Sequence, residues 1–201
     1  MDWSTNLAIK QSRAVQGHFF FNKQLSLHPM VLWHQGGSSS ICTFSDSICH
    51  KAAATWAGIS GLLYEILREG YMKIVFISDS PTKQYRNRYI VSLLEHLVDT
   101  YPEEITVKWI YLESGHGKGA ADGVGATVKS KLKKITARDD NADFSAEELK
   151  KSYLEEDQNV RVITYSKVDV DKIKKSSNYI NAAAKKGIAS CYEIVITRGK
   201  T

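Results

Sequence analysis

Residues Lys73 to Asp79 constrain the fold more than any other stretch of this 201-residue chain. Four consecutive apolar residues are followed there by Ser78 and Asp79, a pattern that predicts a buried strand ending in a carboxylate. Ligands of open sheets gather just beyond the carboxyl ends of the strands, so we expect Asp79 to lie where a metal ion and a phosphate can meet. Three cations follow within the next ten residues: Lys83, Arg86 and Arg88.

Hydrophobic periodicity predicts the other elements. We expect strands at 14–33 (one long strand or a bent pair), 40–45, 73–79, 105–112, 160–165 and 192–197. We expect helices at 50–69, 83–99, 120–137, 145–156 and 169–181, with a glycine-rich loop at 114–119. Antiparallel strands followed by a half in which strands and helices alternate predict an α/β fold with a mixed sheet and helices on both faces.

Composition limits the partners and the compartment. The chain has 27 Lys and Arg against 22 Asp and Glu, a net charge of +5, which suits a polyanionic partner without requiring one. Its three cysteines form no CxxC spacing, so a reducing interior compartment is expected, and Cys49-His50 is read as structural rather than as half of a metal site. No run of 18 apolar residues and no signal-peptide pattern occurs, so no membrane contact is predicted.

The helix predicted at 120–137 has two distinct faces. At about 100° per residue, Asp122, Lys129 and Lys133 project within roughly 40° of one another. The apolar residues form a separate stripe that can dock on a sheet: Val124, Val128, Leu132 and Ile135. The polar face is either an acid placed beside two cations for function or a solvated surface.

The order of the predicted elements is that of the ribonuclease H-like fold, with a mixed five-stranded sheet and a truncated first strand at Asp2. Three stretches also carry a resemblance. The run from Phe76 to Arg88 resembles the segment around the second acid of DDE-type transposases and retroviral-type integrases. The stretch from Trp109 to Lys129, with His-Gly-Lys-Gly followed by Asp-Gly-x-Gly, is similar to uncharacterised transposon-derived animal proteins. Asp2-Trp-Ser-Thr-Asn6 resembles the opening of the same proteins, with Thr5 in place of their glutamate.

This resemblance implies a catalytic-core domain at 1–138 and a small α+β extension at 139–201. Asp2, Asp79 and Asp122 would hold Mg²⁺ or Mn²⁺, with Asp79 bridging, for cutting or joining DNA by two-metal-ion chemistry. The DNA backbone would be contacted by a set of basic side chains: Lys83, Arg86, Arg88, His116, Lys118, Lys129 and Lys133. His116 would contact a phosphate or close the loop. A DNA substrate implies residence in the nucleus.

Four neighbouring features receive structural interpretations. Trp109 and Tyr111 are expected in the core, and Asp46 is expected to be structural or to act behind the acids. The glycines at 115, 117 and 119 either allow a tight turn or approach a phosphate.

Rival functions fit less well. The loop at 114–119 matches neither GxxxxGK[ST] nor GxGxxG, which argues against a nucleotide or other small-molecule cofactor. No GxSxG occurs, which argues against a serine hydrolase. The alternative that remains is a catalytically inactive module that binds DNA or protein, and assembly into a homo-oligomer is left open.

Overall fold

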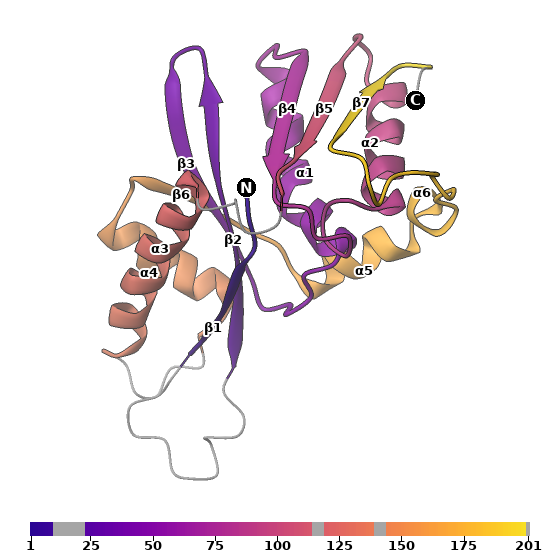
Figure 1. The fold of residues 1–201 in the computed structure, drawn as a ribbon. Helices are drawn as coiled ribbons and strands as arrows, with labels where there is room; N and C mark the ends of the chain where they lie inside the picture. The colour runs from indigo at the N-terminus through magenta and orange to yellow at the C-terminus, as the bar shows by residue number, and fades with distance from the viewer. Residues whose placement is uncertain (10–22, 114–118, 139–143, 200–201) are drawn as a thin grey trace. The chain divides into compact units, whose positions relative to one another are not determined.

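The computed structural model describes residues 1–9, 23–113, 119–138 and 144–199. Figure 1 shows the order of the elements along the chain. The strands of the described residues are β1 Ser4–Ala8, β2 Gln24–His34, β3 Gly37–Ser45, β4 Lys73–Ser78, β5 Thr106–Tyr111, β6 Val160–Thr164 and β7 Glu193–Thr197. Their helices are α1 Ala52–Arg68, α2 Arg88–Thr100, α3 Ala120–Thr136, α4 Ala146–Glu156, α5 Lys167–Lys175 and α6 Ser177–Ile180.

The strands form two mixed sheets, so the predicted α/β class is confirmed. One sheet has the order β1-β2-β3-β6, in which β6 runs parallel to β3 and the other pairs are antiparallel. The other has the order β4-β5-β7, with β5 parallel to β4 and antiparallel to β7. The strands expected in one five-stranded sheet are therefore divided between two, because β1, β2 and β3 pair with neither β4 nor β5 among the described residues.

The chain separates into two compact units, each made of two segments. The first unit comprises Met1–Cys49 and Lys118–Lys167, and the second comprises His50–Gly117 and Val168–Thr201. Each unit combines residues from before and after residue 138, the predicted domain boundary. The segment that was expected to form a separate extension therefore contributes a strand to both sheets.

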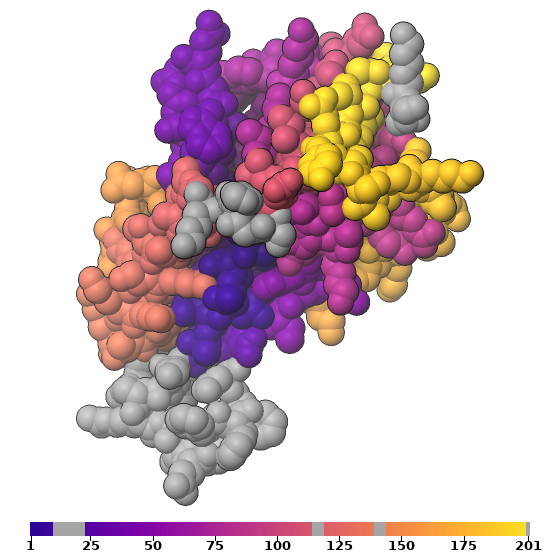
Figure 2. Space-filling view, in the orientation of Figure 1, coloured from indigo at the N-terminus to yellow at the C-terminus, as the bar shows by residue number. Residues whose placement is uncertain are grey.

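The core of the first unit lies between its sheet and the helices α3 and α4. The apolar stripe predicted on α3 is buried in this core together with side chains from β1, β2 and β6. Phe44 of β3 packs edge-on against Tyr153 of α4, with ring centroids 6.0 Å apart. Figure 2 shows the amino-terminal segment, in indigo, lying directly against α3, in salmon. The prediction that one face of this helix docks on a sheet is confirmed.

Pro29 lies inside β2, which is an interior strand of the four-stranded sheet. Proline has no N–H to donate and is normally confined to edge strands. Its carbonyl accepts a hydrogen bond from the Asp2 N–H at 3.2 Å. In an antiparallel strand the N–H and C=O of one residue point the same way, so the donor that Pro29 lacks would face the beginning of β1. The loss is thus limited to one ladder bond near the sheet's edge.

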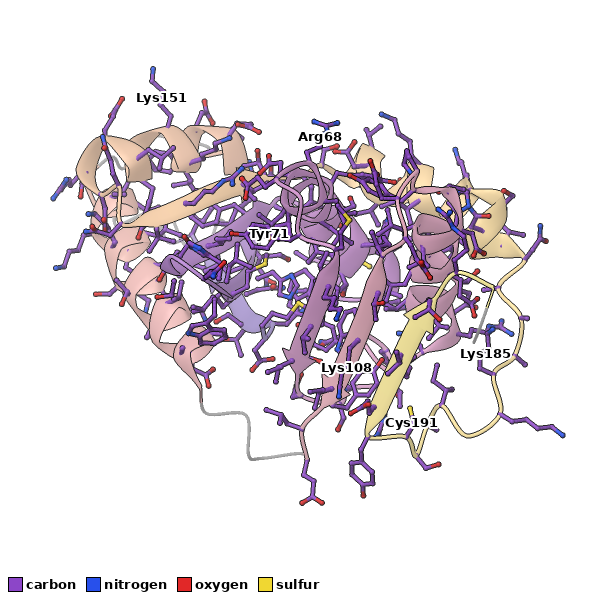
Figure 3. All side chains as sticks on the ribbon, turned by 90° about the horizontal axis from the view of Figure 1, so that it is seen from above. Arg68, Tyr71, Lys108, Lys151, Lys185 and Cys191 are labelled. Carbon is purple, nitrogen blue, oxygen red and sulfur yellow. The ribbon has the colours of Figure 1, made fainter. Side chains whose placement is uncertain are left out.

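The core of the second unit lies on one face of its sheet, which α1 and α2 cover. Alternate residues of β4 and β5 point into this core, and Trp109 is almost fully buried. Their neighbours in the strands point to the opposite face, where Val75, Ile77 and Val195 are exposed. The prediction of a buried strand before Asp79 is therefore wrong, because β4 is an edge strand that is covered on one face only. Lys108 projects from that face in Figure 3 and pairs with Glu193 at 2.7 Å.

Two predicted helix boundaries were wrong. Helix α2 begins at Arg88 rather than near Lys83, because the Asn87 side chain caps it by accepting hydrogen bonds from the N–H groups of Tyr89 and Ile90. The helix expected at 169–181 is two helices, α5 and α6, separated at Ser176. Its hydroxyl donates to the Ile173 carbonyl at 2.7 Å, which ends α5.

Candidate metal and nucleic-acid site

Asp2 and the first turns of α3 meet the same residue of the sheet, Pro29. The Asp2 N–H donates to the Pro29 carbonyl. A Cβ on Gly125 of α3 would lie 3.1 Å from Pro29 Cγ and 3.5 Å from Ser4 Oγ. Gly125 therefore lets the helix come close to the sheet at this point, and Asp122 stands one turn earlier on the helix.

The side chain of Asp2 is directed by its neighbours. Trp3 stacks on His28 with ring centroids 4.4 Å apart and planes 4° apart, on the face of the sheet away from α3. Ser4 faces α3. Because side chains alternate along an extended chain, Asp2 shares the face of Ser4. The first unit thus brings two of the three predicted acids, Asp2 and Asp122, to the same end of α3.

The carboxylate of Asp122 has a structural role as well. It is exposed and accepts a hydrogen bond from the Gly119 N–H at 3.2 Å, at the start of α3. An acid in the first turn is also favoured by the helix dipole.

Lys129 connects α3 to β1 on the polar face of the helix. Its Nζ donates to Thr5 Oγ1 at 2.6 Å. Partial burial, with the neighbouring charge of Lys133 adding to it, lowers the pKa of Lys129. Two turns of helix separate Lys129 from Asp122, so the predicted acid and cation occupy one face. Lys133, one turn further, is exposed.

Asp79 belongs to the second unit and directly follows β4, as predicted. The preceding residue, Ser78, is buried and holds the end of the strand in place. Its hydroxyl accepts a hydrogen bond from Trp109 Nε1 at 2.9 Å and donates to the Asp79 carbonyl at 2.7 Å. The Ser78 carbonyl accepts from the Leu112 N–H at 2.8 Å. The backbone of Asp79 is therefore fixed against β5.

The loop between Asp79 and α2 is anchored at several points. The Pro81 carbonyl accepts from the N–H groups of Gln84 and Tyr85 at 3.1 and 3.0 Å, which forms a tight turn. The Lys83 carbonyl accepts from the Ala52 N–H at 3.0 Å, which joins the loop to the start of α1. These bonds, with the Asn87 cap, join the loop to α1 and to the start of α2.

The three predicted cations, two in this loop and one at the start of α2, differ in what they contact. Arg86 donates from Nη1 to the Cys191 carbonyl at 3.3 Å and lies over the Tyr111 ring, with Cζ 5.9 Å from the centroid. Arg88 is exposed and lies over the Tyr89 ring, which itself stacks on Tyr179. Lys83 is exposed. Lys83 and Arg88 are accessible to a ligand. Arg86 instead connects the segment before β7 to the core through the Cys191 carbonyl and the Tyr111 ring.

Trp109 and Tyr111 lie in the core, as predicted. Phe76 stacks on Trp109 with centroids 4.6 Å apart, and Tyr111 lies 6.0 Å beyond it. Burial raises the pKa of Tyr111, and the charge of Arg86 opposes that shift. This aromatic row supports the strand that ends at Asp79.

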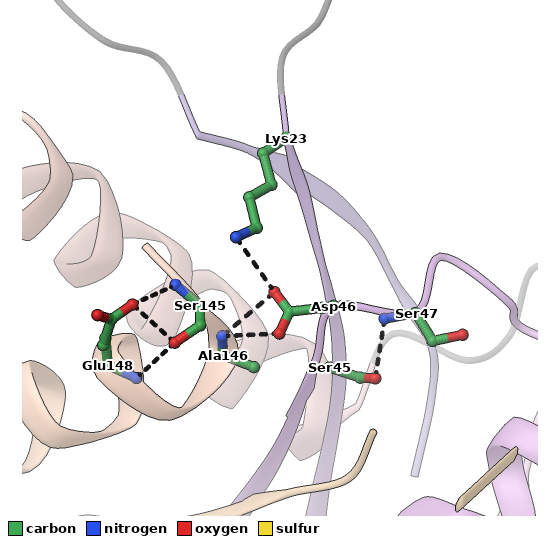
Figure 4. Close-up of polar contacts among 7 residues, drawn as sticks. All are labelled: Lys23, Ser45, Asp46, Ser47, Ser145, Ala146 and Glu148. Atoms are coloured by element: carbon green, nitrogen blue, oxygen red, sulfur yellow. Dashed lines mark hydrogen bonds and ion pairs between the residues drawn. The ribbon is translucent and has the colours of Figure 1, made fainter. Parts of the chain in front are cut away.

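Asp46 has the structural role that was one of its two predicted readings. Its oxygen atoms accept hydrogen bonds from the Ala146 N–H at 3.2 and 3.1 Å, at the start of α4, and pair with Lys23 at 3.9 Å (Figure 4). Next to it, Ser145 and Glu148 form the predicted capping box: the Ser145 hydroxyl accepts from the Glu148 N–H at 3.2 Å, and the Glu148 carboxylate accepts from the Ser145 N–H at 2.7 Å (Figure 4).

Some predicted site residues are not described by the structure, and the three described acids are not grouped together. His116, Lys118 and the glycines at 115 and 117 lie outside the described residues. Among those that are described, no three His, Cys, Asp or Glu side chains are grouped as metal ligands. Asp2 and Asp122 belong to the first unit and Asp79 to the second.

Sequence reasoning missed three residues that shape the first unit's part of the site: Thr5, Pro29 and Gly125. Thr5 departs from the sequence motif, yet its hydroxyl accepts a hydrogen bond from Lys129 Nζ. Gly125 stands between Val124 and Val128, two members of the apolar stripe of α3. A glycine beside such a stripe signals close packing of the helix, and that signal was present in the sequence.

The chain is a mixed α/β protein. Its three predicted acids, Asp2, Asp79 and Asp122, lie before β1, after β4 and in the first turn of α3. It belongs to the family described as Domain of unknown function (DUF8701), whose model matches residues 1–200. No curated protein and no solved structure matches it. Among the helices of the described ranges, none is long and apolar enough to cross a membrane.

Proposed function

We propose that this chain is the catalytic core of a transposase- or integrase-like polynucleotidyl transferase or nuclease that acts on DNA phosphodiester bonds. The observation that carries the proposal is the packing of Gly125 on Pro29. It brings Asp2 and the first turns of α3, which include Asp122, to one position on the sheet. The second glycine of the Asp-Gly-x-Gly motif thereby acquires a physical reason.

The order of the elements also supports the proposal. Three antiparallel strands, β1 to β3, precede α1, and the parallel pair β4 and β5 is connected through α2, with α3 after it. This is the succession expected of a ribonuclease H-like core. The strands β6 and β7 then extend the two sheets at their outer edges.

The chemistry of the proposed ligands suits Mg²⁺ or Mn²⁺. Asp2, Asp79 and Asp122 offer carboxylate oxygens, which are hard donors of the kind that these ions prefer. A pair of such ions activates the attacking hydroxyl or water and stabilises the leaving oxygen of a phosphodiester. In this proposal the chain's own part is to fix the backbone that carries the carboxylates: at Asp79 through the bonds of Ser78, and at Asp2 through Pro29 and the Trp3–His28 stack.

The accessible cations would hold the DNA backbone. Lys133 of α3, Lys83 of the loop before α2 and Arg88 at the start of α2 are exposed. Contacts between such cations and phosphates give salt-dependent affinity that is largely independent of the DNA sequence. A DNA substrate also places the protein in the nucleus within this proposal.

Cleavage of supercoiled plasmid by the full chain in Mn²⁺ tests the proposal. We expect nicking that EDTA abolishes and that Asp79→Asn and Asp122→Asn each reduce at least 100-fold, because each variant removes a metal ligand. Asp99→Asn is the matched control, since Asp99 is an exposed acid at the end of α2. Nicking that survives Asp79→Asn unchanged would exclude the proposed chemistry.

The alternative is a module that binds DNA without cutting it. One observation favours it: the Asp122 carboxylate already serves as a hydrogen-bond acceptor at the start of α3. On that alternative, the wild-type chain binds duplex DNA in a salt-dependent manner but shows no nicking in Mn²⁺, and Asp122→Asn changes stability only.

A further inference from the structure

We propose that Trp33 is a stacking platform for an unpaired base of the DNA substrate, next to the phosphate that the acids would hold. This inference rests on the proposed function. Trp33 is 63% exposed, whereas the chain's other tryptophans, Trp3, Trp56 and Trp109, are at most 9% exposed. A single exposed apolar residue is ordinary, so the inference depends on what surrounds this one.

The residues around the Trp33 ring on the hairpin are small. On β3, Ser38 stands directly opposite and Ser40 is a diagonal neighbour, and Gly36 lies in the turn that joins the two strands. These small residues cannot cover an indole ring, so one of its faces is left for a ligand. The hairpin formed by β2 and β3 extends beyond α3 and α4 in Figure 1, and none of the helices of the first unit covers its tip.

The position of Trp33 relates it to the acids of the first unit. Leu25, Leu27 and Val31 pack on the core that α3 completes, and Pro29 contacts Gly125. Since side chains alternate along a strand, Trp33 is the next residue on this face, beyond the end of α3 where Asp122 stands. Four residues of strand separate Pro29 from Trp33, about 13 Å, which is the rise of about four nucleotides in one DNA strand.

The chemistry of the platform favours a nucleobase over a protein. No Asp, Glu, Lys or Arg occurs from Gln24 to Ser45, so nothing on the hairpin repels a phosphate chain. A protein partner would need a larger apolar surface than one ring bordered by serine and glycine. A base needs only one aromatic face, and hydroxyl or amide groups beside it, such as those of Ser38 and Gln35, can bind its edge.

Binding of two labelled DNAs to the full chain tests this inference. One probe is a blunt duplex, and the other is the same duplex with a four-nucleotide single-stranded extension. We expect Trp33→Ala to lower affinity for the extended duplex about tenfold and to leave the blunt duplex unchanged, because a lost base stack affects only unpaired bases. Trp33→Phe, which keeps an aromatic face, is expected to restore most of the affinity.

The control variant is Ser39→Ala, an exposed residue on the other face of the hairpin, which is expected to bind both probes like the wild type. Equal binding of the extended duplex by Trp33→Ala and the wild type overturns the inference. So does a change in oligomeric state in Trp33→Ala, since the ring would then contact a second copy. If acid-dependent nicking persists in either case, only the role of Trp33 fails; absence of any DNA binding refutes the proposed function too.

Discussion

Gly125 shows how one residue fixes the distance between α3 and the sheet. A side chain there would meet the Pro29 ring at 3.1 Å, and Pro29 is held between two neighbouring strands. Gly123, two residues earlier on the same helix, has nothing within 4 Å of its would-be Cβ. Substituting the two glycines of the Asp-Gly-x-Gly motif should therefore change the free energy of unfolding in opposite directions.

Replacing each glycine with alanine measures this difference. We expect Gly123→Ala to raise the free energy of unfolding by about 0.5–1 kcal/mol, because alanine favours the helix. Gly125→Ala should lower it by about 1 kcal/mol, because the cost of overpacking exceeds the same gain in helix propensity. Urea denaturation of both variants checks the prediction, and equal stabilisation by both would show that α3 is not held close to Pro29.

Protonation of the Glu148 carboxylate should lower the stability of α4 in acid. Its hydrogen bonds from the Ser145 N–H and hydroxyl lower the pKa of the carboxyl below its usual 4.5. The capping contribution is therefore present above the unfolded pKa and is lost as pH falls through the folded pKa.

Glu148→Gln should remove part of this dependence on pH, since the amide cannot be protonated in that range. We expect the thermal midpoint of the wild type to fall more steeply than that of the variant between pH 5 and about pH 3. Parallel curves for the two proteins over this range would mean that the capping carboxylate does not contribute to acid sensitivity.

Among the elements of the second unit, the loop between β4 and α2 carries Asp79, the predicted metal ligand of that unit. Asn87 ends this loop with a two-fold cap on α2. We expect Asn87→Ala to lower the free energy of unfolding by about 1 kcal/mol and Asn87→Ser to lower it less, because serine retains an acceptor oxygen. Hydrogen exchange at the amides of Tyr89 and Ile90 locates the effect, and unchanged exchange there in Asn87→Ala would contradict it.

Features set by neighbouring residues were predictable from the sequence, whereas contacts between distant residues were not. A strand before Asp79, the apolar stripe of α3 and the Ser145 cap each follow from local periodicity or spacing, and all three are confirmed. The predicted burial of that strand is wrong, because local sequence does not show that β4 lies at a sheet edge with one face exposed. The late start of α2 was missed although Asn87 stands just before an apolar run. The tether of Arg86 to the Cys191 carbonyl joins residues 105 apart in sequence, and no local pattern indicates such a contact.

At the scale of the whole molecule, the residues after 138 complete both sheets. Leu149, Tyr153, Val160 and Val162 are buried in the core of the first unit, and β7 pairs with β5 in the second. We therefore expect a fragment of residues 1–138 to lose cooperative folding, because it exposes that core and removes an outer strand from each sheet. Thermal denaturation followed by circular dichroism compares it with the full chain.

A fragment that melts cooperatively at the temperature of the full chain would mean that the predicted boundary at 138 separates independent domains. The buried apolar residues contributed by 139–201 argue for the opposite result.

We propose that the three aspartates Asp2, Asp79 and Asp122 bind divalent ions. Titration of the full chain with Mn²⁺, followed by the electron paramagnetic resonance signal of the free ion, tests it most directly. We predict saturable uptake by the wild type and by Asp99→Asn, and an affinity at least tenfold weaker in Asp2→Asn, Asp79→Asn and Asp122→Asn, each checked for folding by circular dichroism. Uptake in all three variants that equals that of the wild type would contradict the account.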